Sequence, residues 1–317
     1  MTEPPLGLPW LEPLQQRLRT AKTNNRLPHA LILQGTAGIG ANWLAQWLAR
    51  LVLCAAGDAP CGHCQSCTRL QRGQHPDCLT ISPSEDSKEI RIDQIRELIE
   101  DLSLTSHGGG AKIAIITPAD RLNRNAVNAL LKTLEEPTAR THIILVAAQP
   151  GRLPATIRSR CQRMVLPVPS EAQCLGWLQG QAHAPAAWPG VLQILGRQPL
   201  DVLSADAPAV AAIASETRDV LERGIRGDLD AVQTAEKWSK ADYELRLRCI
   251  ETWVTNRLRD LGATKQLPAG SPALNIRALF ELHDAVVELR LLLEVPLNRG
   301  MALERCLWRL PTLRLPV

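Results

Sequence analysis

Two short apolar runs with a helical pattern between them constrain the fold of this chain more than any other feature. Residues 113–116 are four consecutive small or β-branched apolar residues, and residues 142–148 form a second run. Such runs are typical of strands that are buried on both faces of a sheet. Between the runs, before Pro137, apolar residues recur at helical spacing: Leu122, Val127, Leu130, Leu131 and Leu134. This order predicts a β-α-β unit, the building block of a parallel sheet.

The segment after the second run carries the first candidate functional residue. Residues 149–157 are expected to lead over the carboxyl edge of the sheet, where open α/β proteins bind ligands, to Ser159, Arg160 and Cys161. Arg160 is suited to an anion, because a guanidinium stays charged and can bind phosphate oxygens through two hydrogen bonds. In the alternative interpretation, Arg160 only caps the turn before it.

A glycine-rich loop stands between a predicted strand at residues 30–34 and a predicted helix that follows. Its glycines have the spacing of a phosphate-binding loop: Gly35, Gly38 and Gly40. However, Ala41 stands where a lysine would reach the phosphates, and Asn42 stands where a hydroxyl would hold Mg²⁺. The loop is therefore interpreted as degenerate and without a nucleotide function. A simple strand-to-helix turn is the alternative.

Four cysteines with the spacing C-x6-C-x2-C-x2-C come after this helix: Cys54, Cys61, Cys64 and Cys67. The two overlapping C-x2-C steps bring three thiolates within reach of one metal ion, and the cysteine at the end of the helix supplies a fourth. The pattern predicts a closed, structural zinc site, with loose thiols on a loop as the alternative. Cys78 is assigned instead to a buried strand, because a free cysteine packs as a small hydrophobe.

Composition limits the classes of function that are open to the chain. The 317 residues carry a net charge of only +4, and aromatic residues make up 3%, too few for a base-stacking surface. No apolar run is long enough to span a membrane, and the first ten residues resemble neither a signal peptide nor a transit peptide. We therefore expect a soluble, cytoplasmic protein without a membrane partner, in which DNA contact depends on other proteins.

Helical patterns fill the rest of the chain. Residues 170–206 predict a small helical unit interrupted by prolines, among them Pro185. Longer amphipathic segments follow at residues 209–224, 229–238, 241–262, 275–294 and 299–310. Their apolar faces exceed the need of a lone bundle, which favours a partner surface, although simple core packing is the default interpretation.

Four of these features occur together in one known family. They are the NALLKTLEEP segment at residues 128–137, the triplet at 159–161, the degenerate loop at 35–40 and the four cysteines after the helix. Together they resemble the bacterial clamp-loader subunits of the AAA+ class, and within that class the delta-prime family of DNA polymerase III. The likeness covers most of residues 26–166, and beyond residue 210 it rests mainly on the helical layout.

The resemblance implies an α/β domain followed by all-α domains. Residues 1–166 would form a RecA-like AAA+ domain with a parallel sheet and a four-cysteine zinc module at residues 54–78. Residues 167–208 would form a small helical lid domain. Residues 209–317 would form a helical collar domain through which the subunits of a clamp loader associate.

The sequence departs from the ATPase members of the family at each position that hydrolysis needs. Ala41 stands in place of the Walker lysine, and Thr117 and Pro118 stand in place of the acidic strand end. Ala147 and Ala148 replace the sensor threonine, and Pro199 replaces the lid arginine. Arg197 lies near the lid position but out of register. Because phosphoryl transfer needs the lysine, the metal and the positioned water together, the chain is not expected to be an enzyme on its own.

The resemblance implies a role in DNA replication within the DNA polymerase III holoenzyme, a DNA-directed DNA polymerase. In related loaders the arginine of the triplet contacts ATP bound by a neighbouring subunit, so Arg160 is expected to act as an arginine finger in trans. The implied partners are the gamma/tau ATPase subunits and the delta subunit. Through the assembled complex, these subunits load the sliding clamp onto primed DNA, with ATP bound by the neighbours and zinc as the structural cofactor.

Two other functions fit parts of the sequence. One is an active ATPase clamp-loader subunit with an unusual loop. The other is a zinc-dependent DNA-binding module, which would need a strongly basic zinc region. Residues 54–78 contain only Arg69 and Arg72 as basic residues other than histidine, which argues against this second alternative.

Overall fold

The computed structural model divides the chain into two compact units. The residues that it describes are 7–107, 110–181, 188–263, 274–293 and 295–314. One unit contains Met1–Gly180 and Arg197–Asp201, and the other contains Gln181–Gly196 and Val202–Val317. The finer division into domains at residues 1–166, 167–208 and 209–317 stays a prediction.

A five-stranded parallel sheet forms the centre of the first unit, with the strand order β2-β3-β4-β1-β5. The strands are β1 (Ala30–Gln34), β2 (Cys78–Ile81), β3 (Lys112–Ile116), β4 (Thr141–Ala147) and β5 (Gln162–Val165). In the centre of the sheet, Ile32 of β1 lies opposite Leu145 of β4 and Arg163 of β5. The predicted β-α-β unit around NALLKTLEEP is confirmed, since a helix connects β3 to β4.

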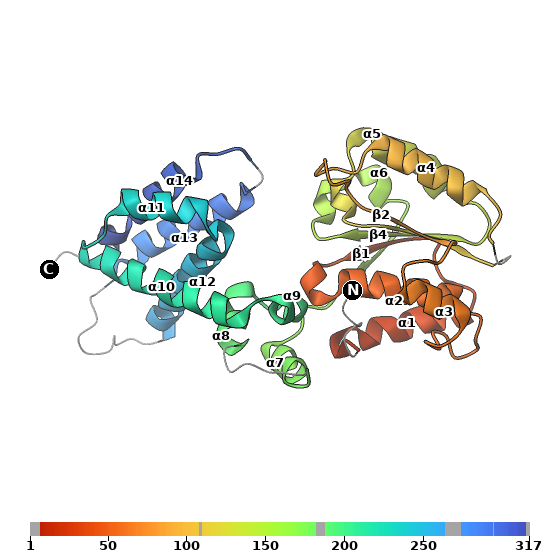
Figure 1. The fold of residues 1–317 in the computed structure, drawn as a ribbon, viewed down its shortest axis with the longest axis horizontal. Helices are drawn as coiled ribbons and strands as arrows, with labels where there is room; N and C mark the ends of the chain where they lie inside the picture. Colours follow the sequence, from red (N-terminus) through yellow and green to blue (C-terminus); the bar gives the residue numbers. More distant parts are fainter. Residues whose placement is uncertain (1–6, 108–109, 182–187, 264–273, 294, 315–317) are drawn as a thin grey trace. The chain divides into compact units, whose positions relative to one another are not determined.

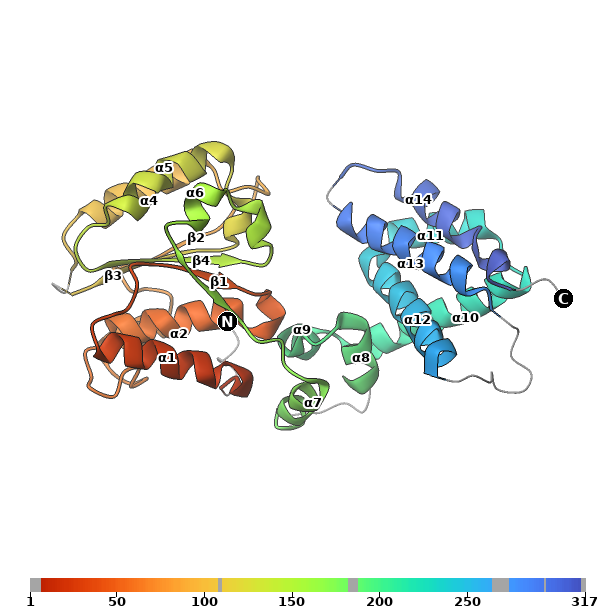
Figure 2. The same cartoon turned by 180° about the vertical axis from the view of Figure 1, so that it is seen from behind.

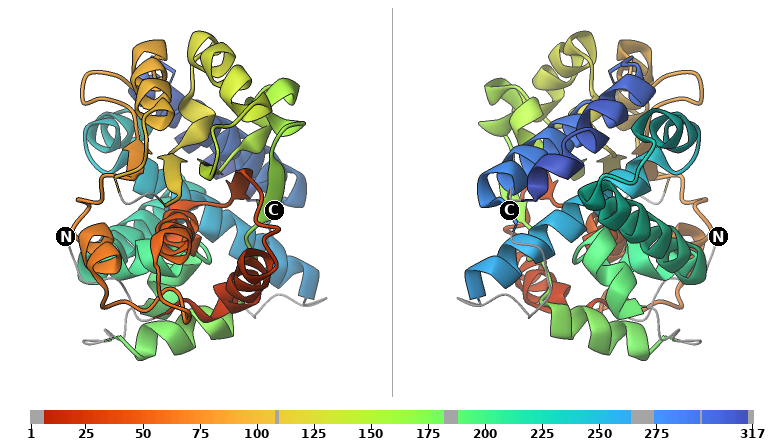
Figure 3. Two further views of the ribbon diagram at one scale, coloured as in Figure 1. Left: turned by 90° about the vertical axis from the view of Figure 1, so that its right-hand side faces the viewer. Right: turned by 90° about the vertical axis from the view of Figure 1, so that its left-hand side faces the viewer.

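Helices cover both faces of this sheet. The helices of the first unit are α1 (Glu12–Thr23), α2 (Ala41–Leu53), α3 (Gln65–Gln71), α4 (Ile92–Ser103), α5 (Arg124–Glu135), α6 (Ala155–Arg158) and α7 (Glu171–Gln179). Helices α4, α5 and α6 lie over one face, and α1 and α2 lie over the other (Figure 1, Figure 2 and Figure 3). Alternate residues of β1, β3 and β4 therefore pack on different helices, yet almost all of them are buried. This double burial explains why the strands appear in the sequence as continuous apolar runs.

Helix α5 follows its predicted pattern with one change at its start. Val127, Leu130 and Leu134 are buried in the core that α5 shares with α4 and the sheet. The amide of Ala126 donates to the side chain of Asn123, which caps the helix. Leu122 therefore lies before the helix rather than in it, although it still packs on the same core.

Helix α4 begins after Arg91, which is its capping residue, and the backbone N–H of Arg91 donates to the side chain of Gln94. Asp93 lies in the first turn of the helix and pairs with Arg96 at 3.5 Å. An acid in the first turn interacts favourably with the positive end of the helix dipole.

The second unit is a bundle of helices around its own apolar core. Its helices are α8 (Trp188–Leu195), α10 (Ala207–Arg226), α11 (Ala231–Lys240), α12 (Tyr243–Ala263), α13 (Ile276–Leu291) and α14 (Arg299–Leu307), while α9 (Pro199–Ser204) has residues in both units. Each of the five long segments predicted after residue 208 contains a helix, although four of these helices begin or end one to three residues inside the predicted bounds. Within the predicted helical regions, residues 182–187, which include Pro185, and residue 294 lie outside the described residues.

A buried arginine ties helices of the second unit together. The guanidinium of Arg246 lies 4.7 Å from the ring centroid of Trp238, and its Nη2 atom lies 2.7 Å from a carboxylate oxygen of Glu216. Lys237 pairs with the other oxygen of Glu216 at 2.8 Å. Hydrogen bonds from Lys237 and Arg246 lower the pKa of Glu216, so this carboxylate stays ionised between its two cations.

Within the described part of the chain, we find no helix whose length and apolar character would let it cross a membrane.

Replacing Leu130 with alanine tests the packing of α5. The Leu130 side chain is fully buried, so its loss is expected to lower the free energy of unfolding by about 2–5 kcal/mol. Lys132→Ala, on the exposed side of the same helix, should change it by less than about 0.5 kcal/mol. Urea denaturation followed by circular dichroism measures both, and equal effects of the two substitutions would contradict the assigned faces of α5.

Candidate functional site

Arg160 lies at the amino edge of the sheet, not at the carboxyl edge where it was expected. Strand β4 ends at Ala147 at the carboxyl edge, but α6 returns the chain along the sheet before β5 begins at Gln162. All strands are parallel, so the two residues before β5 must lie at the amino edge. The prediction placed the segment after β4 without counting the return that a parallel strand requires.

The guanidinium of Arg160 is bound by side chains and backbone of its own chain. Its Nε donates to Glu135 Oε1 at 2.7 Å, and its Nη2 lies 2.5 Å from the same oxygen. Its Nη1 donates to the carbonyl of Thr156 at 3.0 Å and to Ser159 Oγ at 3.2 Å. Arg160 thus caps the turn before it, as the alternative interpretation held, and also forms an ion pair with the last residue of α5.

The two neighbours of Arg160 in the triplet have different surroundings. The hydroxyl of Ser159 donates to the carbonyl of Thr156, which stabilises the turn. Cys161 is buried in the core below α5 and α6, and this burial raises the pKa of its thiol to about 11. A thiol that stays protonated and covered is unsuited to nucleophilic chemistry, so Arg160 is the chemically available group of the triplet.

The glycine-rich loop lies at the opposite, carboxyl edge of the sheet, between β1 and α2. Gly40 has a φ of +96°, a left-handed conformation that glycine adopts without strain, and it leads directly into α2. Ala41 is fully buried. The hydroxyl of Thr117, at the end of β3, donates to Asn42 Oδ1 at 2.6 Å. A direct hydrogen bond therefore joins the two positions that would hold Mg²⁺ in a hydrolysing relative.

An acidic side chain from helix α9 packs against the middle of this loop. A Cβ atom placed on Gly38 would lie 2.4 Å from Asp201 Oδ2 and 2.6 Å from the Cβ of Gln198. The carboxylate of Asp201 is therefore in close contact with the backbone at Gly38. This side chain occupies the space beside a loop whose glycines have the spacing of a phosphate-binding loop.

A cavity of about 400 Å³ opens beside the loop. It is lined by residues of β1, the loop, the ends of β4 and β5 and the segment before α9: Gln34, Gly35, Thr36, Ile39, Ala148, Val165, Leu166, Val168, Arg197 and Gln198. Arg197, which is out of register in the sequence, thus lies at the cavity. The tertiary structure places the Arg197 cation near the degenerate loop, and it places the Asp201 carboxylate against the same loop.

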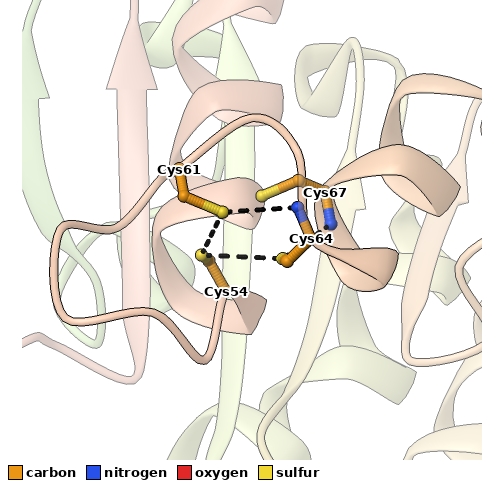
Figure 4. A group of neighbouring side chains, drawn as sticks. All are labelled: Cys54, Cys61, Cys64 and Cys67. Carbon is orange, nitrogen blue, oxygen red and sulfur yellow. Dashed lines mark hydrogen bonds between the residues drawn. The ribbon is translucent and has the colours of Figure 1, made fainter.

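The four cysteines of the C-x6-C-x2-C-x2-C pattern converge, as Figure 4 shows. Their sulfur atoms all lie within 4.8 Å of one another. Cys54 Sγ lies 3.6 Å from Cys61 Sγ and 3.8 Å from Cys64 Sγ. Four sulfurs around zinc at about 2.3 Å would be about 3.8 Å apart, so the arrangement fits a tetrahedral metal ion.

The surroundings of two of these thiols shift their pKa values in opposite directions. Backbone hydrogen bonds at His63 and Cys64 lower the pKa of Cys61 to about 6, whereas burial raises the pKa of Cys67 to about 12. The Sγ of Cys64 accepts from the backbone N–H of Cys67 at the start of α3. A bound metal would have to displace the proton of Cys67, so metal affinity should rise with pH.

Two residues that contact the candidate groups were not singled out from the sequence. Glu135 belongs to the NALLKTLEEP segment and lies at the carboxyl end of α5, where an acid is unfavourable for the helix dipole. This unfavourable position could have indicated that Glu135 has a role other than helix stability. Asp201 offered no signal, because it follows Gly38 by a long stretch of chain. Near the loop, Asp120 accepts a hydrogen bond from the backbone N–H of Gln149 at 3.1 Å.

Replacing Gly38 with alanine tests the contact between the loop and Asp201. The added methyl group would overlap both Asp201 and Gln198, so the free energy of unfolding should fall by about 1–3 kcal/mol. Gly151→Ala is the control, because an added Cβ there meets nothing within 4 Å. Thermal and urea unfolding of the two variants measure the difference. An unchanged stability of the Gly38 variant would refute this packing.

Comparison with known proteins shows the relationship of the chain. A family model described as DNA polymerase III, delta subunit matches residues 10–170. The chain is 34% identical to DNA polymerase III subunit delta' of Pseudomonas aeruginosa, over 79% of this chain and 77% of the relative. It is 41% identical to the delta' subunit of Escherichia coli over 54% of this chain and 52% of the relative. It is also 30% identical to DNA polymerase III subunit tau of Escherichia coli over 68% of this chain and 35% of the relative. The chain therefore belongs to the delta-prime family of DNA polymerase III clamp-loader subunits.

Proposed function

We propose that this chain is a clamp-loader subunit that does not hydrolyse ATP and that supplies Arg160 to ATP bound by a neighbouring subunit. The observation that carries the proposal is the separation of its two candidate groups. The degenerate loop follows the end of β1, whereas Arg160 precedes the start of β5, which pairs with β1 in parallel. The five residues of β1 span about 16 Å, so Arg160 cannot reach an anion bound at its own loop.

Three features of the loop support the absence of hydrolysis. Ala41 has no charge with which to contact phosphates. The hydrogen bond between Thr117 and Asn42 occupies the metal position, and the carboxylate of Asp201 packs against Gly38. Phosphoryl transfer depends on electrostatic stabilisation by a lysine and a metal ion, and these contacts supply neither.

The chemistry of Arg160 supports its action in trans. A guanidinium can neutralise charge that develops on the γ-phosphate, and its planar shape suits bidentate contact with phosphate oxygens. The partners that we propose are the gamma/tau ATPase subunits and the delta subunit, since one relative of the chain is itself a tau subunit. The assembled ring would contact the sliding clamp and primed DNA, mainly through phosphates, in the cytoplasm.

An active ATPase remains the second candidate, and the position of Arg197 at the cavity beside the loop favours it. ATP turnover by the purified chain alone distinguishes the two. We expect no turnover above the background of a mock purification without the chain, because the lysine and metal ligands are absent.

We propose zinc as the metal of the four-cysteine cluster, with a structural role. A closed set of four thiolates leaves no open position for substrate, and the cluster fastens α3 to the end of α2.

Metal analysis of protein purified without chelator should find about one equivalent of zinc per chain. Cys64→Ser should lose it, because three thiolates bind zinc more weakly than four. Cys78→Ser should retain it, since Cys78 lies in β2 and outside the cluster. Much less than one equivalent in the native chain, or equal loss in both variants, would remove the proposal.

Substituting Arg160 tests the proposed catalytic role. A loader is assembled in which only the ATPase subunit next to Arg160 can hydrolyse ATP, and its single-turnover rate is measured with clamp and primed DNA. Arg160→Ala should lower that rate by about a thousandfold. Arg158→Ala, an exposed arginine two residues away, should leave it unchanged. A normal rate in the assembled Arg160→Ala loader would limit Arg160 to capping its turn.

A further inference from the structure

We infer that Glu135 is a latch that holds Arg160 on its own chain until a neighbouring phosphate displaces it. The inference rests on the proposed function of Arg160 and assigns Glu135 as its positioning residue. Glu135 ends α5, and Arg160 follows α6, so the pair joins two helices on the same face of the sheet. The two side chains are partly exposed, 47% for Glu135 and 36% for Arg160, and a partner can therefore reach them.

The hydrogen bonds of Arg160 leave too few donors for a phosphate. A guanidinium has five N–H groups. Two of them, on Nε and Nη2, point at Glu135, and both hydrogens of Nη1 are used by Thr156 and Ser159. Only the second hydrogen of Nη2 remains. Because bidentate contact with phosphate needs two adjacent donors, Arg160 must leave at least one partner of its own chain before it can bind ATP in trans.

Glu135 is the partner that phosphate most directly replaces. It is the only charged group among the three, and the doubly hydrogen-bonded edge that it occupies is the edge that recognises carboxylate and phosphate alike. Thr156 and Ser159, by contrast, lie in the turn that carries Arg160 and can keep Nη1 in place while the other edge changes partner. The contacts of Nη1 with Thr156 and Ser159 can therefore stay in place, while the contacts of Nε and Nη2 with Glu135 can be exchanged for contacts with phosphate.

The strength of the ion pair suits an exchange. A solvent-exposed ion pair shifts an equilibrium by about fivefold at most, whereas a γ-phosphate carries more negative charge than a carboxylate. The pair is thus strong enough to reduce the population of free Arg160 and weak enough to be broken when the ATP site closes. A latch of this kind would lower ATP hydrolysis before clamp and DNA are bound.

The position of Glu135 within its helix supports a role other than helix stability. As the last residue of α5 it lies at the negative end of the helix dipole, where an acid is unfavourable. Glu136 follows it, carries the same charge and is also exposed, but does not take part in the ion pair. The chain thus offers a matched control at the next position.

The test uses the assembled loader in which only the ATPase subunit next to Arg160 is active. Single-turnover hydrolysis is measured with and without clamp and primed DNA for the native chain, Glu135→Gln and Glu136→Gln. Glutamine keeps the shape of glutamate but removes its charge. We expect Glu135→Gln to raise the unstimulated rate by about two- to fivefold, to leave the stimulated rate unchanged, and thus to reduce the degree of stimulation. Glu136→Gln should behave as the native chain does.

The double variant separates a latch from a purely structural effect. In chains that carry Arg160→Ala, adding Glu135→Gln should have no further effect on either rate, because the latch acts only through the arginine. Assembly of the loader and its melting temperature are measured in parallel, and both should match the native values, since the two side chains are exposed.

Each outcome decides a different claim. An unstimulated rate that does not change in Glu135→Gln overturns the latch. A fall in both rates also overturns it, because Glu135 would then orient Arg160 toward ATP rather than withhold it. A normal rate in Arg160→Ala alone overturns the proposed function itself, whatever Glu135 does. The two failures are therefore distinguishable within one set of measurements.

Discussion

All five strands of the first unit run in the same direction, and this constraint determines where its functional groups can lie. In a parallel sheet the loops that leave the strands gather at one edge and the segments that enter them gather at the other. The glycine-rich loop follows the carboxyl end of β1. Arg160 lies just before the amino end of β5, and Glu135 lies shortly before the amino end of β4. The two candidate groups are therefore held apart by the length of the strands. The strands β1, β3 and β4 are almost fully buried, as is typical of a parallel sheet covered on both faces.

At the loop that we propose to be degenerate, two contacts within the chain lie where a hydrolysing relative would bind a metal ion and a phosphate. Where a hydrolysing relative needs a metal between two side chains, Thr117 donates directly to Asn42. Where a phosphate would approach the glycine backbone, the carboxylate of Asp201 packs on Gly38. The hydrogen bond between Thr117 and Asn42 also satisfies two polar side chains at this edge of the sheet. The loop is therefore interpreted as a structural joint between β1, β3 and α9 that keeps the shape of a phosphate site without its charge.

Arg160 and the cysteine cluster illustrate two ways of preparing a charged group. The cysteines are brought together by short spacings, and their geometry already suits a metal ion. Arg160 is held by contacts of its own chain, and the role in trans that we propose for it would require these contacts to change. A structural site gains from being complete in advance, because binding then costs little reorganisation. A group that acts across an interface gains from being restrained until its partner arrives.

The sequence by itself determined the elements that depend on local pattern. The apolar runs, the helical spacing of Val127, Leu130 and Leu134, and the short steps between the cysteines predicted a parallel sheet, helix α5 and a four-cysteine cluster, and the structure contains all three. These features follow from periodicity or from neighbours a few residues apart, so they are visible in one dimension. The lost Walker lysine was equally visible, because it is a matter of residue identity at a fixed spacing.

Only the tertiary structure decided which distant groups meet. Thr117 and Asn42 are 75 residues apart, and Glu135 and Arg160 are 25 residues apart. The edge of the sheet at which Arg160 lies depended on the return of the chain through α6, which the local pattern did not reveal. Hydrogen bonds and ion pairs between side chains need atoms within about 3 Å, and such proximity is set by how the helices pack on the sheet. Sequence spacing therefore identified the candidate groups, while packing chose their partners.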